Sequence, residues 1–299
     1  MQKVEFKQIE DYLTKCRFEF RIEGDKNIIV EGFSSITNYK EETMTWLKDE
    51  KILNNTNRKD NILLCIVQEG NEIAARTKII SKASKTVFFS VINEFWNDID
   101  EEAPQIGQGT IIGRQVQIGE NVQIGNNCSL SGKVIIGDNT VIGDNVVIRN
   151  RVNIGNDCQI QSMVVIGEDG YGYTEDTNHQ KKMIKHYGGV CIGNEVFIGS
   201  HVNIARGVID DTVIEDGVKI APSSHIGHNG HIEKNASIVC SKLFGSVGVG
   251  ENAYIASSVI RNQIKIGENT VIGMGSVVTK DVDSDKVVYG NPAKVIRNI

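Results

Sequence analysis

All six histidines of the chain lie between positions 179 and 231, and three of them share one short motif. His225, His228 and His231 are spaced three residues apart, as H-x-x-H-x-x-H. On a helix this spacing would suggest a metal site, but short strands separated by corners send these side chains in different directions. A neutral imidazole, with an unperturbed pKa of about 6.5, can accept a proton at cellular pH. His228 is therefore the candidate general base, and no metal site is predicted.

The chemistry that suits such a base is attack of an amine on a thioester. The amine loses a proton as the new bond forms, and the developing oxyanion needs a preorganised donor. Gly245 lies about one coil after His228, at an irregularity of the sequence pattern, so its backbone N–H is the candidate donor. No cysteine or serine is paired with a base in the pattern, which predicts direct transfer without a covalent enzyme intermediate.

The elements that must position these groups follow from a six-residue repeat. An aliphatic residue recurs at every sixth position from Ile106 to Ile166, and the series resumes at Ile192 and ends at Val278. A typical unit is Ile-Gly-Asp-Asn-Val-Val at 142–147. Residues two apart on a strand share a face, so each unit sends two aliphatic side chains inward while Gly, Asp and Asn form the corner. The repeat predicts a mainly β, three-sided parallel β-helix of about eighteen residues per coil, whose filled interior leaves any chemistry on the outside.

The repeat also sets the domain boundaries. Residues 101–283 are the predicted β-helix, with a loop insertion at 168–190 whose Tyr171 and Tyr173 are expected to contact substrate. Residues 1–100 lack the repeat and are predicted to form a small α/β domain, joined through Asp100–Gln105. Residues 284–299 form a short C-terminal extension. Within the first domain the expected elements are a helix at Lys7–Lys15, strands at Ile28–Phe33, Met44–Leu47, Ile62–Val67 and Thr86–Val91, and a short helix near Asn93–Asp98.

Composition excludes several classes of function. The 299 residues carry a net charge of −6 with interspersed signs, which argues against nucleic acid as a partner. No run of eighteen apolar residues and no leader-like N-terminus occurs, so we expect no membrane insertion and a cytoplasmic location. The six cysteines contain no C-x-x-C pair, which indicates reduced thiols.

Several ordered motifs resemble one known family. They are G-E-D-G-Y-G-Y at 167–173, G-G-V at 188–190, A-R-G-V-I-D-D-T-V-I at 205–214 and I-G-H-N at 226–229, with I-V-E-G-F-S-S-I at 29–36 and M-T-W-L at 44–47. Together they resemble the UDP-3-O-acylglucosamine N-acyltransferases of lipid A synthesis. The resemblance implies a left-handed β-helix, a homotrimer, and active sites between neighbouring subunits. It also implies that residues 1–100 are a nucleotide-binding domain.

The resemblance also implies roles for particular residues. His228 matches the family's catalytic base, Gly245 its oxyanion glycine, and Trp46 the aromatic residue that stacks on the nucleotide base. His225 and Asn229 would then position the sugar.

Other positions depart from that family. Ala205 replaces an acidic residue, Ala221-Pro222 replaces Asp-Asn, His225 replaces a glutamine, and Gln263 replaces a second histidine. The ending G-N-P-A-K-V-I-R-N-I at 290–299 resembles the coenzyme A-dependent sugar acetyltransferases. In that case Lys280, Lys294 and Arg297 would meet the phosphates of coenzyme A.

From these departures we expect an N-acyltransferase that moves a short acyl group from acyl-CoA to the amine of a dTDP- or UDP-linked amino-deoxy sugar. Three alternatives stay open. One is a lipid A pathway UDP-3-O-acylglucosamine N-acyltransferase that uses acyl carrier protein. The others are a γ-type carbonic anhydrase with zinc between subunits and a solenoid that serves only as a scaffold.

Overall fold

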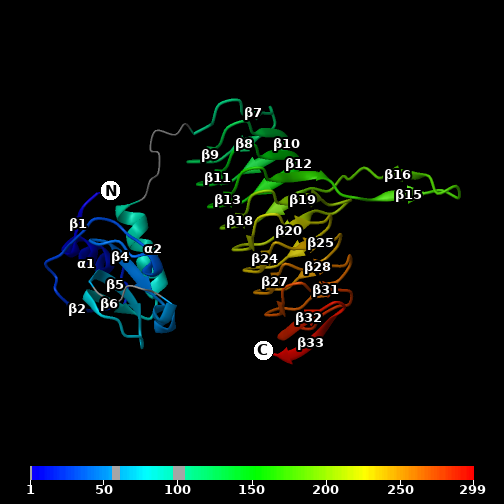
Figure 1. The fold of residues 1–299 in the computed structure, drawn as a ribbon. Helices are drawn as coiled ribbons and strands as arrows, with labels where there is room; N and C mark the ends of the chain where they lie inside the picture. The colour runs from blue at the N-terminus through cyan, green and yellow to red at the C-terminus, as the bar shows by residue number, and fades with distance from the viewer. Residues whose placement is uncertain (1, 56–60, 97–104) are drawn as a thin grey trace. The chain divides into compact units, whose positions relative to one another are not determined.

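The computed structural model describes residues 2–55, 61–96 and 105–299. The chain divides into two compact units, Met1–Glu101 and Glu102–Ile299, which are coloured from blue to cyan and from green to red in Figure 1. Of the predicted linker Asp100–Gln105, only Gln105 falls within the described residues.

The first unit is a small α/β domain built on a sheet of order β2-β6-β5-β4. The pairs β4–β5 and β5–β6 are parallel, and β2–β6 is antiparallel. Its elements are β1 (Val4–Glu5), α1 (Phe6–Lys15), β2 (Arg21–Gly24), β3 (Ile29–Val30), η1 (Ile36–Asn38), β4 (Met44–Leu47), η2 (Glu50–Asn55), β5 (Ile62–Gln68), β6 (Ala75–Ser81) and α2 (Ser84–Phe95). The central strand β5 is buried on both faces, with Leu64 and Ile66 in one apolar cluster and Cys65 and Val67 in another.

One predicted element of this unit is wrong. The segment Thr86–Val91, expected to be a strand, lies inside helix α2. Its β-branched and aromatic residues favour a strand locally, but the buried positions Ser84, Val87, Phe88 and Val91 have helical spacing, and packing against the sheet decides the outcome. The helix expected near Asn93–Asp98 is the end of α2 as far as Phe95, and residues 97–98 lie outside the described residues. The helix at Lys7–Lys15 and the strands at Met44–Leu47 and Ile62–Val67 are confirmed, whereas only Ile29–Val30 of Ile28–Phe33 is a strand.

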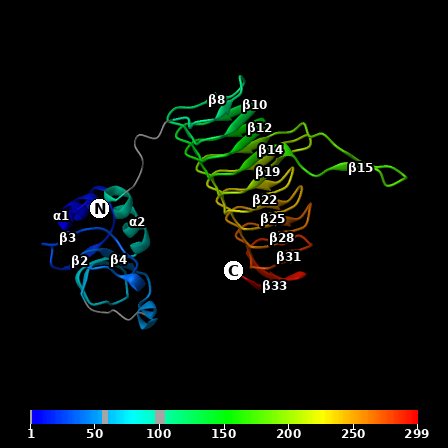
Figure 2. The same ribbon diagram turned by 45° about the horizontal axis from the view of Figure 1, so that its top comes forward.

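The second unit is a solenoid of stacked coils with three faces (Figures 1 and 2). One face carries β9 (Gln123–Ile124), β11 (Val141–Ile142), β13 (Gln159–Ile160), β18 (Phe197–Ile198), β21 (Lys219–Ile220), β24 (Ser237–Val239), β27 (Tyr254–Ala256), β30 (Val271–Ile272), β32 (Lys286–Gly290) and β33 (Ala293–Asn298).

The other two faces form one continuous sheet because the long strands β10 (Ser129–Ile136) and β12 (Val147–Ile154) run around the corner between them. The second face carries β7 (Ile111–Ile112), β14 (Val165–Asp169), β19 (Asn203–Arg206), β22 (His225–Ile226), β25 (Lys242–Leu243), β28 (Val259–Ile260) and β31 (Val277–Val278). The third carries β8 (Gln117–Ile118), β17 (Val190–Ile192), β20 (Thr212–Ile214), β23 (His231–Ile232), β26 (Gly248–Val249) and β29 (Lys265–Ile266).

The inward residues are those that the repeat predicts. From Val122 to Val288 the sixth-position aliphatic residues and the small or β-branched residues two positions before them form one buried cluster. Ile106 and Ile118 in the first coils are the exceptions and remain partly exposed, because a terminal coil has a neighbour on one side only. Cys128 and Cys158 occupy inward positions of the same cluster, as expected of core residues.

Asparagine makes many of the corners possible. Asn121, Asn127, Asn139, Asn145 and Asn229 all have φ between 54° and 58°. This left-handed region is costly for most residues, and asparagine tolerates it because its short polar side chain can hydrogen-bond locally. The corner residues of the repeat are therefore largely explained by backbone geometry.

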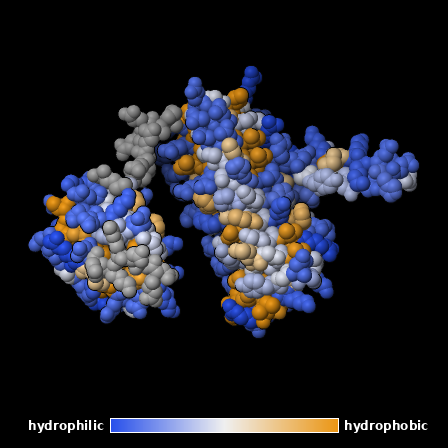
Figure 3. Space-filling model, viewed as in Figure 1, coloured by the Kyte–Doolittle hydropathy of each residue, from blue (hydrophilic) through white to orange (hydrophobic). Residues whose placement is uncertain are grey.

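Two segments depart from the coil pattern. The insertion at 168–190 contains an antiparallel hairpin, β15 (Tyr173–Glu175) and β16 (Lys181–Met183), which projects from the solenoid as a hydrophilic arm (Figures 2 and 3). At the other end, β33 folds back antiparallel on β32, and β32 pairs in parallel with β30. This C-terminal hairpin continues one face and covers the last coil.

The predicted mainly β solenoid with a small N-terminal α/β unit is confirmed. Among the described residues, no helix is both long enough and apolar enough to cross a lipid bilayer. The homotrimer stays a prediction.

Two adjacent isoleucines of β10 test the inward–outward alternation. Ile136 is 1% exposed and Ile135 is 46% exposed. We expect Ile136→Ala to lower the free energy of unfolding by about 2–5 kcal/mol, because it leaves a cavity between stacked coils. The matched Ile135→Ala should change it by about 0.5 kcal/mol at most. Urea titration followed by circular dichroism measures both, and equal losses would contradict the alternation.

Candidate active site

His228 lies at the corner between the second and third faces, after β22 and before β23. It is half-buried. Its ring points along the solenoid axis toward the next coil: a Cβ atom built on Gly245 would lie 2.5 Å from His228 Nε2. Because Gly245 has no side chain, the imidazole occupies space that any other residue there would fill.

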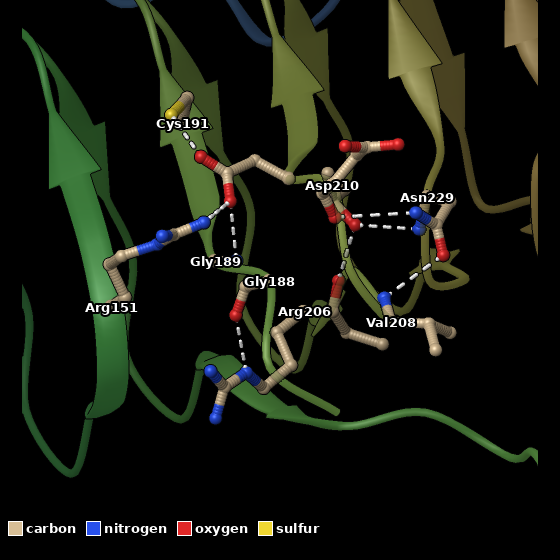
Figure 4. Close-up of polar contacts among 11 residues, drawn as sticks. Arg151, Gly188, Gly189, Cys191, Arg206, Val208, Asp210 and Asn229 are labelled. Carbon is tan, nitrogen blue, oxygen red and sulfur yellow. Dashed lines mark hydrogen bonds and ion pairs between the residues drawn. The ribbon is translucent and has the colours of Figure 1, made fainter. Parts of the chain in front are cut away.

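The neighbouring amide of Asn229 determines which ring nitrogen of His228 carries the proton. Val208 N donates to Asn229 Oδ1 at 3.0 Å, and Asn229 Nδ2 donates to the carbonyl oxygen of Asp210 at 3.2 Å (Figure 4). These two bonds fix the amide, so Oδ1 accepts from His228 Nδ1 at 3.0 Å. The proton of a neutral ring then sits on Nδ1, and the lone pair of Nε2 is free to accept another proton.

The segment that holds Asn229 is itself anchored. Arg206 is 8% exposed and its Nε donates to the carbonyl oxygen of Gly188 at 2.6 Å (Figure 4). Asp211 accepts hydrogen bonds from Arg151, from Gly189 N and from Cys191 Sγ. Burial disfavours the charge on Asp211, but these donors outweigh it and hold the pKa of the carboxyl below its usual range. Asp211 therefore stays ionised. Its hydrogen bonds connect the start of β17 to the loop at 208–211, which in turn holds Asn229.

A pocket of about 410 Å³ opens beside His228. It brings together four residues that the sequence analysis chose, namely His228, Gly245, His225 and Tyr171. The full lining is Gly170, Tyr171, Ala205, His225, Gly227, His228, Phe244, Gly245 and Asn262. A larger groove of about 760 Å³ along β23, β26 and β29 includes Asn229 and His231 but none of the other predicted site residues.

The backbone N–H of Gly245 faces no acceptor among the described residues. At several corners the N–H at the same position donates to a side chain of the next coil: Asn126 N donates to Asp144 Oδ1 at 2.6 Å, and Asn194 N donates to Asp216 Oδ1 at 2.8 Å. The stack beside His228 is shorter, since His225 pairs with Lys242, seventeen residues on, whereas Ser129 pairs with Val147, eighteen residues on. The irregular coil leaves a free donor on the same pocket as the His228 ring.

The other two histidines of the motif have different surroundings. His225 is half-buried, and burial together with the nearby Lys242 ammonium lowers its pKa below the ordinary 6.5. His231 is exposed, and its Nε2 lies 2.8 Å from Glu215 Oε1. No group of three or more potential metal ligands occurs in the part of the chain that the structure describes.

The predicted substrate contacts Tyr171 and Tyr173 lie where the insertion leaves the coils. The centroids of their rings are 5.6 Å apart, and the ring planes meet at 69°. Tyr171 is 75% exposed and lines the pocket, whereas Tyr173 starts β15 and packs under Lys181. Tyr171 is therefore brought to the His228 pocket, and Tyr173 is not.

Trp46 belongs to the other compact unit. Its Nε1 donates to Ser84 Oγ at 2.9 Å, and its ring stacks on Phe88 with centroids 6.3 Å apart. It lines an apolar pocket of about 420 Å³ with Phe33, Ile36, Phe89 and Ile92, among others. The indole N–H is thus already satisfied, and the ring offers an apolar surface; its predicted stacking on a nucleotide base stays a prediction.

Lys280, Lys294 and Arg297 are all exposed. Lys294 and Arg297 lie on β33, opposite Tyr289 and Val287 of β32. Their contact with the phosphates of coenzyme A stays a prediction.

Sequence reasoning missed His186, which is fully buried and lies edge-on to the His228 ring at 5.3 Å. It sits where the chain returns from the arm, outside any hexad. The sequence signal that could have found it is its position two residues before the Gly-Gly-Val motif at 188–190.

Comparisons with known proteins agree with the repeat-built solenoid. Residues 133–168 match the model of the bacterial transferase hexapeptide (six repeats), and residues 208–298 match that of the GMPPB C-terminal domain. The UDP-3-O-acylglucosamine N-acyltransferase of Delftia acidovorans is 43% identical over 86 residues, which are 28% of this chain and 25% of that protein. The protein of the same name from Saccharophagus degradans is 48% identical over 73 residues, 24% of this chain and 21% of that protein. The matched segments thus span about a quarter of the length of these relatives.

Solved structures agree on the solenoid. LpxA from Acinetobacter baumannii superposes with a TM-score of 0.59 at 26% identity, over 65% of this chain and 74% of that one. The UDP-N-acetylglucosamine acyltransferase from Campylobacter jejuni gives a TM-score of 0.58 at 23% identity, over 64% and 73%, and supports the fold alone.

The chain is a hexapeptide-repeat protein of the left-handed parallel β-helix class. Within that class, the predicted resemblance to the UDP-3-O-acylglucosamine N-acyltransferases is confirmed.

One prediction is overturned by the same findings. The expected transfer of a short acyl group from acyl-CoA to a dTDP- or UDP-linked amino-deoxy sugar is wrong, because the curated relatives are UDP-3-O-acylglucosamine N-acyltransferases. The acceptor in that expectation relied on the positions that depart from the lipid A family, and the donor relied on the ending at 290–299. In the structure this segment forms most of the hairpin β32–β33, which continues a sheet and covers the last coil, so its sequence has a structural explanation.

A pair of glycines tests the close contact between Gly245 and His228. We expect Gly245→Ala to lower turnover about a hundredfold, because the new methyl group would displace the imidazole. Gly248→Ala is the matched control, since a Cβ there would meet only Lys265 Cγ, at 3.8 Å. Both variants should keep the wild-type circular dichroism spectrum. Full activity in Gly245→Ala would mean that the ring is not used in this position.

Proposed function

We propose that this protein is an N-acyltransferase that acylates the amine of a UDP-linked, 3-O-acylated glucosamine. The observation that carries the proposal is the pairing, on one pocket, of an imidazole whose Nε2 is free with a backbone N–H that has no acceptor. The names of the curated relatives supply the substrate class, and their local identity of 43–48% supports carrying it to this chain.

The transfer would proceed by direct attack. The amine nitrogen forms a bond to the thioester carbonyl carbon, and one of its protons passes to His228 Nε2. The carbonyl oxygen becomes an oxyanion that accepts the hydrogen bond of Gly245 N–H. As the tetrahedral intermediate collapses, the C–S bond breaks and the departing thiolate takes the proton from the imidazolium. Asn229 stabilises that imidazolium through Nδ1 and keeps the ring in place.

We take an acyl carrier protein as the thioester donor, the alternative that the family resemblance implies. The N-terminal unit with Trp46 would hold the nucleotide, and His225, kept neutral by its lowered pKa, would contact the sugar. Tyr171 would close the open side of the pocket.

We further propose that the protein works as a homotrimer with sites between neighbouring subunits. Large apolar side chains stand exposed on the solenoid, including Phe244 on the pocket itself and Ile209 and Met274, which are 76% and 74% exposed. An exposed apolar side chain beside a polar site, as Phe244 is here, is typical of a surface that another protein covers. Light scattering after gel filtration should give three times the mass of the chain, and a monomer would contradict this part of the proposal.

His228→Ala tests the assignment of the base. We expect a loss in kcat of about 10²–10⁴-fold, since proton transfer by a positioned side chain contributes that much. His231→Ala is the control, because this nearby histidine is exposed and paired with Glu215 outside the pocket. A loss below tenfold would mean that the amine arrives already deprotonated and that His228 does no more than orient it.

Donor and acceptor are tested together by mass spectrometry of the products. UDP-3-O-acylglucosamine with a hydroxyacyl-loaded acyl carrier protein should yield the N-acylated sugar and free carrier thiol. Acetyl-CoA with the same acceptor should give no more product than a protein-free blank. Turnover of acetyl-CoA alone, or no transfer from either donor, would overturn the proposed reaction.

A further inference from the structure

His186 is a buried histidine with an unused hydrogen-bonding atom beside the proposed base. It is 0% exposed and lies where the chain returns from β16 to β17. Its Nδ1 is 3.0 Å from the carbonyl oxygen of Ile184, which can only accept, so Nδ1 donates. In a neutral ring Nε2 is then a bare acceptor, and Nε2 is buried without a hydrogen-bond partner.

Such an atom is costly to keep. A buried acceptor without a partner destabilises a folded protein, and most buried polar atoms are therefore paired. The backbone of His186 is held in place, because His186 N donates to Asp169 Oδ2 at 3.2 Å. Asp169 in turn lies 3.9 Å from Arg206. The ring is therefore positioned by its surroundings, while its Nε2 contributes nothing to the fold.

The unpaired nitrogen lies beside the catalytic pocket. The rings of His186 and His228 meet edge to face, with centroids 5.3 Å apart and planes at 84°. Gly170 lies against both: a Cβ atom built on it would be 2.9 Å from His228 Cδ2 and 3.2 Å from His186 Nε2. Gly170 and Tyr171 form part of the pocket lining. A small shift of this glycine segment would open His186 Nε2 to a molecule in the pocket.

We propose that His186 is a second residue that binds the acyl acceptor, its Nε2 accepting a hydrogen bond from the amine of the amino sugar. This inference rests on the proposed function and extends it. A primary amine has two N–H bonds and one lone pair. With one N–H directed to His228 Nε2 and the other to His186 Nε2, the lone pair is left to point at the thioester carbon. His228 removes a proton, and His186 orients the nucleophile.

Two substitutions distinguish hydrogen bonding by His186 Nε2 from a role of the side chain in packing alone. In His186→Asn, the amide can replace the Nδ1 bond to Ile184 but nothing replaces Nε2. In His186→Gln, the longer side chain returns an amide oxygen close to the Nε2 position. We expect kcat/KM for the amino sugar to fall about tenfold in His186→Asn, as for loss of one hydrogen bond, and to stay within about threefold of wild type in His186→Gln. The KM of the acyl donor should not change in either variant.

His179→Asn is the matched control, since His179 is an exposed histidine of the arm that contacts Glu175. Thermal melting checks that each variant is folded. If a folded His186→Asn keeps the wild-type kcat/KM, or if His186→Gln loses as much as His186→Asn, the inference is wrong.

A binding measurement keeps this test separate from that of the reaction. In protein labelled with ¹⁵N-histidine, the Nε2 resonance of His186 should shift when UDP-3-O-acylglucosamine is added without any donor. The His179 resonance should not move. A shift in a protein that transfers no acyl group would overturn the proposed reaction but support this binding role, and an unmoved His186 resonance at saturation would overturn the role itself.

Discussion

Aliphatic side chains fill the solenoid from end to end, and this filling dictates where any chemistry can occur. Ile136, Ile154 and Ile220 are each at most 1% exposed, and the residues two positions before such anchors are buried with them. Stacked strands share their backbone hydrogen bonds with the coils on either side, so the backbone N–H and C=O groups of the three faces are already paired. What remains available is the corners, where the chain turns and the ladder is interrupted. The candidate site lies at one of these corners.

The candidate site lies where the regular stacking of the coils is interrupted in two ways. At several corners the backbone N–H donates to an Asp or Asn side chain of the next coil, as Asn126 N does to Asp144. At Gly245 that side-chain acceptor is missing, and the glycine leaves space that the His228 ring occupies. The second failure is the insertion at 168–190, which brings Gly170 and His186 against the same ring. The proposed base, a backbone N–H without an acceptor among the described residues and a second imidazole meet where a shortened coil and the insertion lie against the same ring.

This explains which parts of the molecule could be predicted from the sequence. The period of six identified the inward residues and the corners, since it reports directly on the geometry of the backbone. It could not place His186, because a residue in an insertion belongs to no period and its burial depends on how the arm leaves and rejoins the coils. In the first unit, Thr86–Val91 was assigned by residue type to a strand, although the helical spacing of Val87, Phe88 and Val91 agrees with α2. The reaction was misjudged partly because motif similarity at 290–299 was given more weight than the position of this segment at the end of the solenoid.

Asn229 shows how closely the fold and the chemistry are joined. The corner requires a φ of 57°, which glycine and asparagine adopt most easily. The chemistry requires an acceptor for His228 Nδ1, which glycine lacks. An aspartate could accept that bond, but its carboxylate would face the carbonyl oxygen of Asp210, to which Asn229 now donates. Only a side chain that accepts on one side and donates on the other, on a backbone that tolerates positive φ, meets both demands. The same residue that turns the chain therefore selects the tautomer of the proposed base, so the demands of the fold and of the proposed proton transfer fall on one position.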